Sequence, residues 1–133
     1  MSIPPTWDMY VEEYLMKIEN SRQLKAGAII GPGAYIWAQT DEFPTFKEAE
    51  MTSIMREFRD PGTLESLSFG GKTYMEIQHV GDSVIRARIP DSNSGITIAK
   101  TWTIHLIGLY DQTPKECSQI VENLGIYIKG KGH

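Results

Sequence analysis

The chain has 133 residues, which suits one domain that buries roughly two thirds of the surface of its unfolded chain. Hydrophobic residues at 41% and charged residues at 23% are typical of a globular protein and exclude a disordered or membrane-embedded chain. A net charge of −4 disfavours nucleic acid as a partner, and the single cysteine, together with the lack of a secretion signal or a transmembrane run, predicts a cytoplasmic protein without an internal disulfide.

The first predicted helix carries a row of aromatic side chains. Residues 1–5 are expected to form a loose arm ahead of a domain that spans residues 6–133. Trp7, Tyr10 and Tyr14 recur at helical spacing beside an aliphatic stripe that suits a core. Aromatic rings with polar tips favour proline-rich segments, because a polyproline II helix is already ordered before it docks. The row therefore indicates a proline-rich ligand, and the alternative is that the three rings simply pack.

The middle of the chain is predicted to hold a hairpin, a helix and a meander. Residues 26–30 and 35–39 are short apolar runs joined by Gly31-Pro32-Gly33-Ala34, which is typical of a hairpin. Apolar residues recur at helical spacing over 47–58. Beyond Gly62 the period changes to two, and the short gaps make neighbouring strands antiparallel. The predicted strands are 67–69, 73–80, 83–88, 95–99 and 102–110.

The final predicted helix begins at a capping box, Thr113-Pro114-Lys115-Glu116. Gly125 inside it is expected to permit close contact of this helix, and Gly130 suits its C-terminal stop. Its core stripe is Cys117, Ile120, Val121, Leu124 and Ile128. The order of elements predicts an α+β fold, with a central antiparallel sheet covered by helices.

Candidate catalytic and metal-binding motifs are incomplete. Gly70-Gly71-Lys72-Thr73 matches the end of a phosphate-binding loop, but the first glycine is missing and a strand follows, so we interpret it as a turn. His79, His105 and His133 lack metal-ligand spacing, and we expect His105 to be structural and satisfied by a neighbour. Cys117 belongs to a buried stripe, which favours a core residue over a nucleophile. The sequence therefore predicts no enzyme, metal or other cofactor.

Two groups of residues suit binding instead. The first is aromatic and would form one cluster if the first and last helices pack side by side: Trp7, Tyr10, Trp37 and Tyr127. The second is cationic and comes from the meander and the start of the last helix: Lys72, Arg86, Arg88 and Lys115. Such a patch suits an acidic partner surface or anionic lipid headgroups, and the alternative for each cation is a solvated charge at a strand edge.

Motifs along nearly the whole chain after Pro5 occur in the order and spacing of one family. Thr6-Trp7-Asp8-Met9-Tyr10-Val11-Glu12 resembles the amino-terminal signature of profilins. Further motifs resemble the plant-type branch of that family: Ala28-Ile29-Ile30-Gly31, Ile36-Trp37-Ala38-Gln39, Phe43-Pro44-Thr45-Phe46-Lys47, Asp60-Pro61-Gly62, Gly95-Ile96-Thr97-Ile98, Gly108-Leu109-Tyr110 and Thr113-Pro114. Each motif is weak alone, but their joint order is specific.

The resemblance implies a single-domain profilin fold, with the terminal helices on one face of the sheet and smaller helices on the other. It also implies a surface for formins and other proline-rich proteins, formed by Trp7, Tyr10, Trp37 and Tyr127. The implied surface for monomeric actin is Lys72, Gln78, Arg86, Arg88, Lys115 and Gln119. Phosphoinositide headgroups are a further implied ligand, bound by basic residues that overlap these surfaces.

Two internal features depart from the family pattern. The 89–94 loop is longer and carries Pro90 and Asp91 where a lysine- and glycine-rich turn is usual, and Trp102 stands where small residues are typical. An exposed Trp102 would extend a partner surface, whereas a buried one would pack against the sheet. We predict a monomeric regulator of actin polymerisation. The alternatives are an adaptor for proline-rich ligands that has lost actin binding, and a small-molecule sensor built on a similar sheet.

Overall fold

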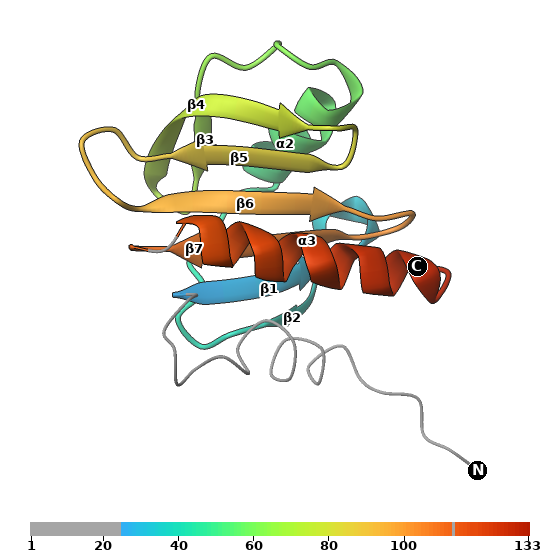
Figure 1. The fold of residues 1–133 in the computed structure, drawn as a ribbon. Helices are drawn as coiled ribbons and strands as arrows, with labels where there is room; N and C mark the ends of the chain where they lie inside the picture. The colour runs from blue at the N-terminus through green and yellow to red at the C-terminus, as the bar shows by residue number, and fades with distance from the viewer. Residues whose placement is uncertain (1–24, 113) are drawn as a thin grey trace.

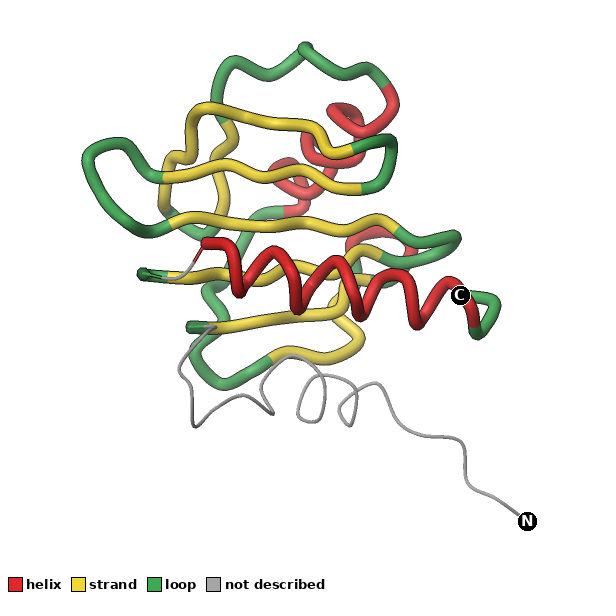
Figure 2. The backbone as a smooth tube through the Cα atoms, in the orientation of Figure 1, coloured by secondary structure: helices red, strands yellow, loops and turns green. Residues whose placement is uncertain are grey.

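A seven-stranded antiparallel sheet forms the centre of the computed structural model, which describes residues 25–112 and 114–133. The strand order is β2-β1-β7-β6-β5-β4-β3 (Figures 1 and 2). The strands are β1 (Ala26–Ile30), β2 (Ile36–Gln39), β3 (Leu67–Phe69), β4 (Lys72–Val80), β5 (Val84–Arg88), β6 (Gly95–Lys100) and β7 (His105–Tyr110). Because β1 pairs with both β2 and β7, the first hairpin joins the sheet beside the last strand of the meander.

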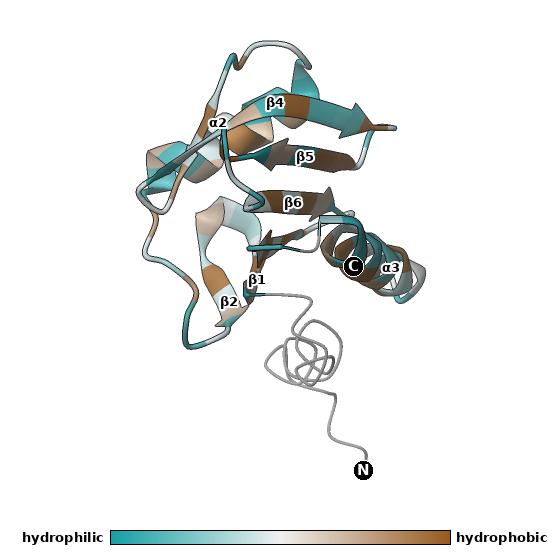
Figure 3. Cartoon of the chain, turned by 60° about the vertical axis from the view of Figure 1, so that its left-hand side comes forward, coloured by the Kyte–Doolittle hydropathy of each residue, from teal (hydrophilic) through white to brown (hydrophobic). Residues whose placement is uncertain are grey.

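Two helices cover opposite faces of this sheet (Figure 3). On one face, α2 (Glu48–Arg59) packs its apolar stripe into a core that includes Ile96 and Ile98, close to the short 3-10 helix η3 (Pro32–Ala34). On the other, α3 (Pro114–Gly130) lies over β6 and β7 and packs against Ala99. Successive side chains of β6 therefore serve the two cores in alternation, as the pleat of a strand requires.

Most of the predicted elements in the described residues are confirmed. The hairpin, the helix over 47–58, the antiparallel meander and the final helix all form, and the Gly70-Gly71 motif is the turn between β3 and β4. The arm, the first helix and Thr113 of the predicted capping box lie outside the described residues.

The start of the last strand was placed wrongly by its pattern. Residues 101–104 form a turn, and β7 begins only at His105. The Thr101 N–H donates to the Ile104 carbonyl at 2.9 Å, and the hydroxyl groups of Thr101 and Thr103 both donate to the His133 main-chain oxygen at 2.9 Å. The alternating polar and apolar residues of this turn resemble a strand, but their hydrogen bonds join the turn to itself and to His133, which follows α3.

Packing corrects the expectation for His105 and gives the partner for the one at Gly125. Neither ring nitrogen of His105 has a hydrogen-bond partner among the described residues, so the expected polar neighbour is missing. Its ring instead lies 5.6 Å from that of Phe58. A Cβ added at Gly125 would come within 3.3 Å of the Ala99 Cβ, so the expected close contact at this glycine is between α3 and the sheet.

Candidate binding surfaces

A hollow of about 470 Å³ lies where β4, β5, the 89–94 loop and the start of α3 meet. Antiparallel register places Gln78 of β4 opposite Arg86 of β5, and the chain returns to the same place after β7 to begin α3. We call this hollow the groove face. Four of the predicted actin-surface residues line it: Gln78, Arg86, Arg88 and Lys115.

The remaining two predicted residues lie beside the groove face rather than in it. Lys72 is exposed at the start of β4 and lines a smaller hollow of about 120 Å³ that also includes Tyr74 and Tyr110. Burial is the main cause that raises the pKa of Tyr74 to about 12, so its hydroxyl is uncharged near neutral pH. Gln119 is exposed on α3, one turn beyond Lys115.

The groove face carries both signs of charge, because its two arginines have carboxylate partners. Arg86 donates from Nη2 to the Glu122 carboxylate of α3 at 2.6 Å. Arg88 is bonded through Nε to the Glu76 carboxylate, and this hydrogen bond is the first cause that raises the pKa of Arg88. Each arginine therefore has an internal carboxylate partner, and the hydrogen bond from Arg86 Nη2 ties β5 to α3.

Trp37, one of the predicted aromatic residues, lies on β2, the edge strand at the other end of the sheet from β3. The β1–β2 ladder pairs Ile29 with Ala38 and Ile30 with Ile36, so Trp37 is the extra residue of a β-bulge. The Trp37 ring lies over Gly31, where an added Cβ would come within 2.1 Å of ring atoms.

Tyr127 stands on α3 next to Ile128, which shares a core cluster with Ala38, the neighbour of Trp37. The exposed fractions of Trp37 and Tyr127 are 39% and 41%. We call Trp37 and Tyr127 the aromatic surface. Trp7 and Tyr10, its other two predicted members, lie outside the described residues.

Trp102 is exposed, so of the two positions considered for it, exposed or packed against the sheet, the structure has the exposed one. The ring is 70% exposed on the turn between β6 and β7, and the Lys129 ammonium lies 4.6 Å from its centroid. This is the distance range of a cation–π contact.

Cys117, the candidate nucleophile of the sequence, is buried. Burial raises the pKa of the Cys117 thiol to about 12, so this side chain is a core residue and not a thiolate nucleophile. No cluster of His, Cys, Asp and Glu side chains suitable for a metal ion occurs in residues 25–112 and 114–133. Across the same ranges, no helix is both long enough and apolar enough to cross a membrane.

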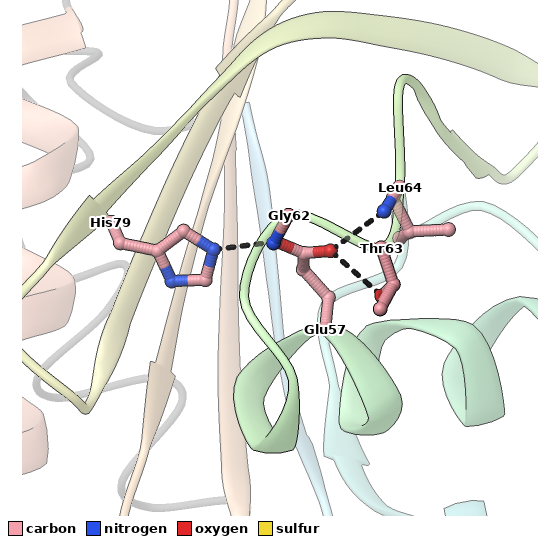
Figure 4. A network of polar contacts seen from close by, with 5 residues as sticks. All are labelled: Glu57, Gly62, Thr63, Leu64 and His79. Atoms are coloured by element: carbon pink, nitrogen blue, oxygen red, sulfur yellow. Dashed lines mark hydrogen bonds and ion pairs between the residues drawn. The ribbon is translucent and has the colours of Figure 1, made fainter.

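One buried carboxylate was not singled out by the sequence patterns. Glu57 of α2 is 1% exposed and accepts hydrogen bonds from Gly62 N and Leu64 N at 2.8 Å, with His79 Nε2 at 2.6 Å (Figure 4). Burial alone would raise the pKa of Glu57, but these contacts and one from Thr63 outweigh it and lower the pKa to about 2. The carboxylate holds the loop after α2 and joins it to β4. In the sequence, the one indication that Glu57 is buried was its position next to Phe58, which belongs to the core stripe of α2.

The fold and these surfaces define a single α+β domain that presents two separate candidate binding faces. A family model for profilins matches residues 5–133. The chain therefore belongs to the profilin family.

Solved profilin structures share this fold. The profilin of Schizosaccharomyces pombe is 25% identical and has a TM-score of 0.82, over 96% of this chain and 100% of that chain. Mouse profilin IIa in complex with a double repeat from the FH1 domain of mDia1 is 14% identical, with a TM-score of 0.72 over 92% and 99% of the two chains. LokiProfilin2 in complex with rabbit actin is 18% identical, with a TM-score of 0.72 over 90% and 93%.

Proposed function

We propose that this chain binds monomeric actin through the groove face and proline-rich segments through the aromatic surface, and that it thereby regulates actin polymerisation. The observation that carries the proposal is the separation of the two faces. The groove face is built by β4, β5 and the start of α3, whereas the aromatic surface comes from β2 and the C-terminal half of α3. The complexes of LokiProfilin2 with actin and of mouse profilin IIa with an FH1 repeat support both kinds of partner.

The proposed actin contacts centre on Gln78, Arg86, Arg88 and Lys115, because these four line one hollow. Lys72 and Gln119 are proposed as contacts at its margin. For the proline-rich ligand, formin-type segments in particular, we propose that Trp7 and Tyr10 complete the surface that Trp37 and Tyr127 begin. An interface of this kind is expected to give micromolar to submicromolar actin affinity, roughly −8 to −9 kcal/mol.

A specific observation favours a second candidate, an adaptor for proline-rich ligands with weak or lost actin binding. Arg86 and Arg88 are already paired with Glu122 and Glu76. A partner carboxylate must compete with these internal ones, and exposed ion pairs contribute little net affinity. A pyrene-actin nucleation assay beside a polyproline titration separates the two candidates.

Charge reversal at Arg86 and truncation at Trp37 test the two-surface proposal. Arg86→Glu removes the pair with Glu122 and places two carboxylates together, so we expect at least tenfold weaker actin binding with unchanged polyproline binding. Trp37→Ala should do the reverse. Arg59→Glu is the matched control, because Arg59 is an exposed arginine at the end of α2 on the other face of the sheet.

Actin affinity is measured by suppression of spontaneous nucleation, and polyproline affinity by tryptophan fluorescence. Circular dichroism confirms that each variant is folded. The two-surface proposal is wrong if Arg86→Glu and Trp37→Ala, both correctly folded, reduce the two activities equally.

The localisation, the oligomeric state, the lipid ligand and the family branch of this protein stay predictions. We infer a cytoplasmic, cytoskeleton-associated, monomeric binding protein rather than an enzyme, with the domain proper over residues 6–133. Phosphoinositide binding is proposed through the cations of the groove face, and its test is sedimentation with vesicles that contain these lipids. The sequence motifs favour the plant-type branch, whereas the similar structures described above include yeast and mouse profilins, so branch membership rests on the motifs alone.

A further inference from the structure

Five residues of α3 form one continuous stripe along its outer side. Spacings of four, three, four and three residues keep them on the same helical face. They are Lys115, Gln119, Glu122, Ile126 and Lys129. Lys115 and Gln119 belong to the proposed actin surface, and Glu122 is bonded to Arg86 in the groove face. The stripe therefore leads from the groove face toward the C-terminal end of the helix.

The far end of this stripe is apolar and exposed. Ile126 is 71% exposed although the other isoleucines of α3 are buried or half-buried, and Trp102 is 70% exposed. The Lys129 ammonium lies 4.6 Å from the Trp102 ring centroid, so the turn between β6 and β7 meets the stripe here. Figure 1 shows the C-terminal end of α3 beside that turn. We call Trp102, Ile126 and Lys129 the stripe end.

Trp102 is presented on a turn that its own hydrogen bonds hold. Thr101 and Thr103, on either side of it, both bond to the main-chain oxygen of His133, and Thr101 N also donates to Ile104 O at 2.9 Å. A rigid aromatic side chain loses little conformational entropy on binding. Exposed tryptophan in such a setting is the residue type most often responsible for binding energy at protein interfaces.

The distance from the groove face to the stripe end is short enough for one partner to cover both. Lys115 lines the groove face, and Ile126 lies eleven positions further along α3, which is roughly 16 Å along a helix. A standard interface buries about 800 Å² on each partner, equivalent to a disc of roughly 16 Å radius. An interface centred near Lys115 therefore reaches Ile126 at its margin, and Trp102 lies next to that margin, beside Lys129.

The charges of the groove face explain why such an extension is needed. Its arginines are paired internally, so they supply specificity more than affinity. Apolar anchors next to them supply the missing affinity. The apolar residues of the stripe end do not belong to the aromatic surface. Tyr127 and Lys129 lie on opposite sides of the buried stripe of α3.

We propose that Trp102 and Ile126 extend the actin-binding surface to the C-terminal end of α3 and act as its apolar anchor. The proposal rests on the proposed actin binding of the groove face. Lys129 holds the Trp102 ring in place through the cation–π contact.

The test uses the full chain with Trp102→Ala and Ile126→Ser, and Tyr35→Ala as the matched control, since Tyr35 is 72% exposed on the hairpin. Affinity for monomeric actin is measured by pyrene-actin nucleation, affinity for polyproline by fluorescence, and self-association by sedimentation velocity. We expect Trp102→Ala to weaken actin binding about tenfold or more and Ile126→Ser about threefold, with polyproline affinity unchanged. Tyr35→Ala should match the parent in actin binding.

Three results overturn the proposal and differ from one another. If both variants keep the parent's actin affinity while Arg86→Glu loses it, the extension is wrong and the proposed function stands. If the parent does not bind actin at all, the proposed function itself fails. If the parent is a dimer that Trp102→Ala dissociates, the stripe end is a contact between two copies of the chain.

Discussion

Replacing His105 with leucine is expected to remove an acid sensitivity that originates between the sheet and α2. His105 begins β7, its ring lies against Phe58, and neither of its nitrogens is hydrogen-bonded among the described residues. Burial, followed by the charge of Lys100, lowers the pKa of His105 from 6.5 to about 4. Lys100 is its direct neighbour in the β6–β7 ladder.

The sign of the effect follows from which state binds the proton. Between pH 6.5 and 4 the unfolded chain protonates His105 and the folded chain does not, so stability is lost as the pH falls through this range. A shift of one pKa unit corresponds to about 1.4 kcal/mol, and at pH 5 the expected loss is about 2 kcal/mol. Leucine has no proton to bind and no hydrogen bond to lose, so His105→Leu should be at least as stable as the parent at pH 7.

Urea unfolding followed by tryptophan fluorescence at pH 7 and pH 5 measures the effect directly. The parent should lose about 2 kcal/mol more than His105→Leu between these two pH values. His133→Gln is the control, because His133 is an exposed histidine and its main-chain oxygen, not its ring, accepts the bonds from the 101–104 turn. An equal loss in parent and His105→Leu would refute the reasoning.

Glu57, Gly31 and Cys117 carry three further predictions. Glu57→Gln should reduce the free energy of unfolding by about 2 kcal/mol at pH 7, and thermal scans should find this difference shrinking as the pH falls from 4.5 toward 2, where the parent carboxylate is protonated. Gly31→Ala should displace the Trp37 ring and weaken polyproline binding at least tenfold, whereas Gly130→Ala, which faces open space, should leave it unchanged. Cys117 should resist iodoacetamide at pH 8 in the native protein and react in urea, and mass spectrometry would expose the opposite result.

Elements defined by local pattern could be predicted from the sequence. The period of two and the glycine turns define β3 to β6, and helical spacing defines α2 and α3. The pairing of β1 with β7 could not be predicted in this way, because it joins segments about eighty residues apart and no local signal encodes it. The false strand start at residue 102 has the same origin, since only the contact with His133 distinguishes this turn from a strand.

The ion pairs of the candidate sites could not be predicted from the sequence for a related reason. The predicted cations Arg86 and Arg88 do gather at one hollow, but their partners come from α3 and β4. Which glutamate meets which arginine depends on strand register and on the position of the helix over the sheet. The exposure of Trp102 was left open for the same reason, because its turn is oriented by the end of α3.

The two proposed surfaces are kept apart by α3 itself. Its buried stripe from Cys117 to Ile128 is fixed on the sheet, so the residues to either side of that stripe must face in different directions. Glu122 lies on the side that meets Arg86, and Tyr127 lies on the other side. A ligand on one side therefore does not need the atoms that bind the other. Gly125 allows α3 to pack close against Ala99 of the sheet. Independent binding at the two proposed surfaces is thus the expected consequence of how α3 packs on the sheet.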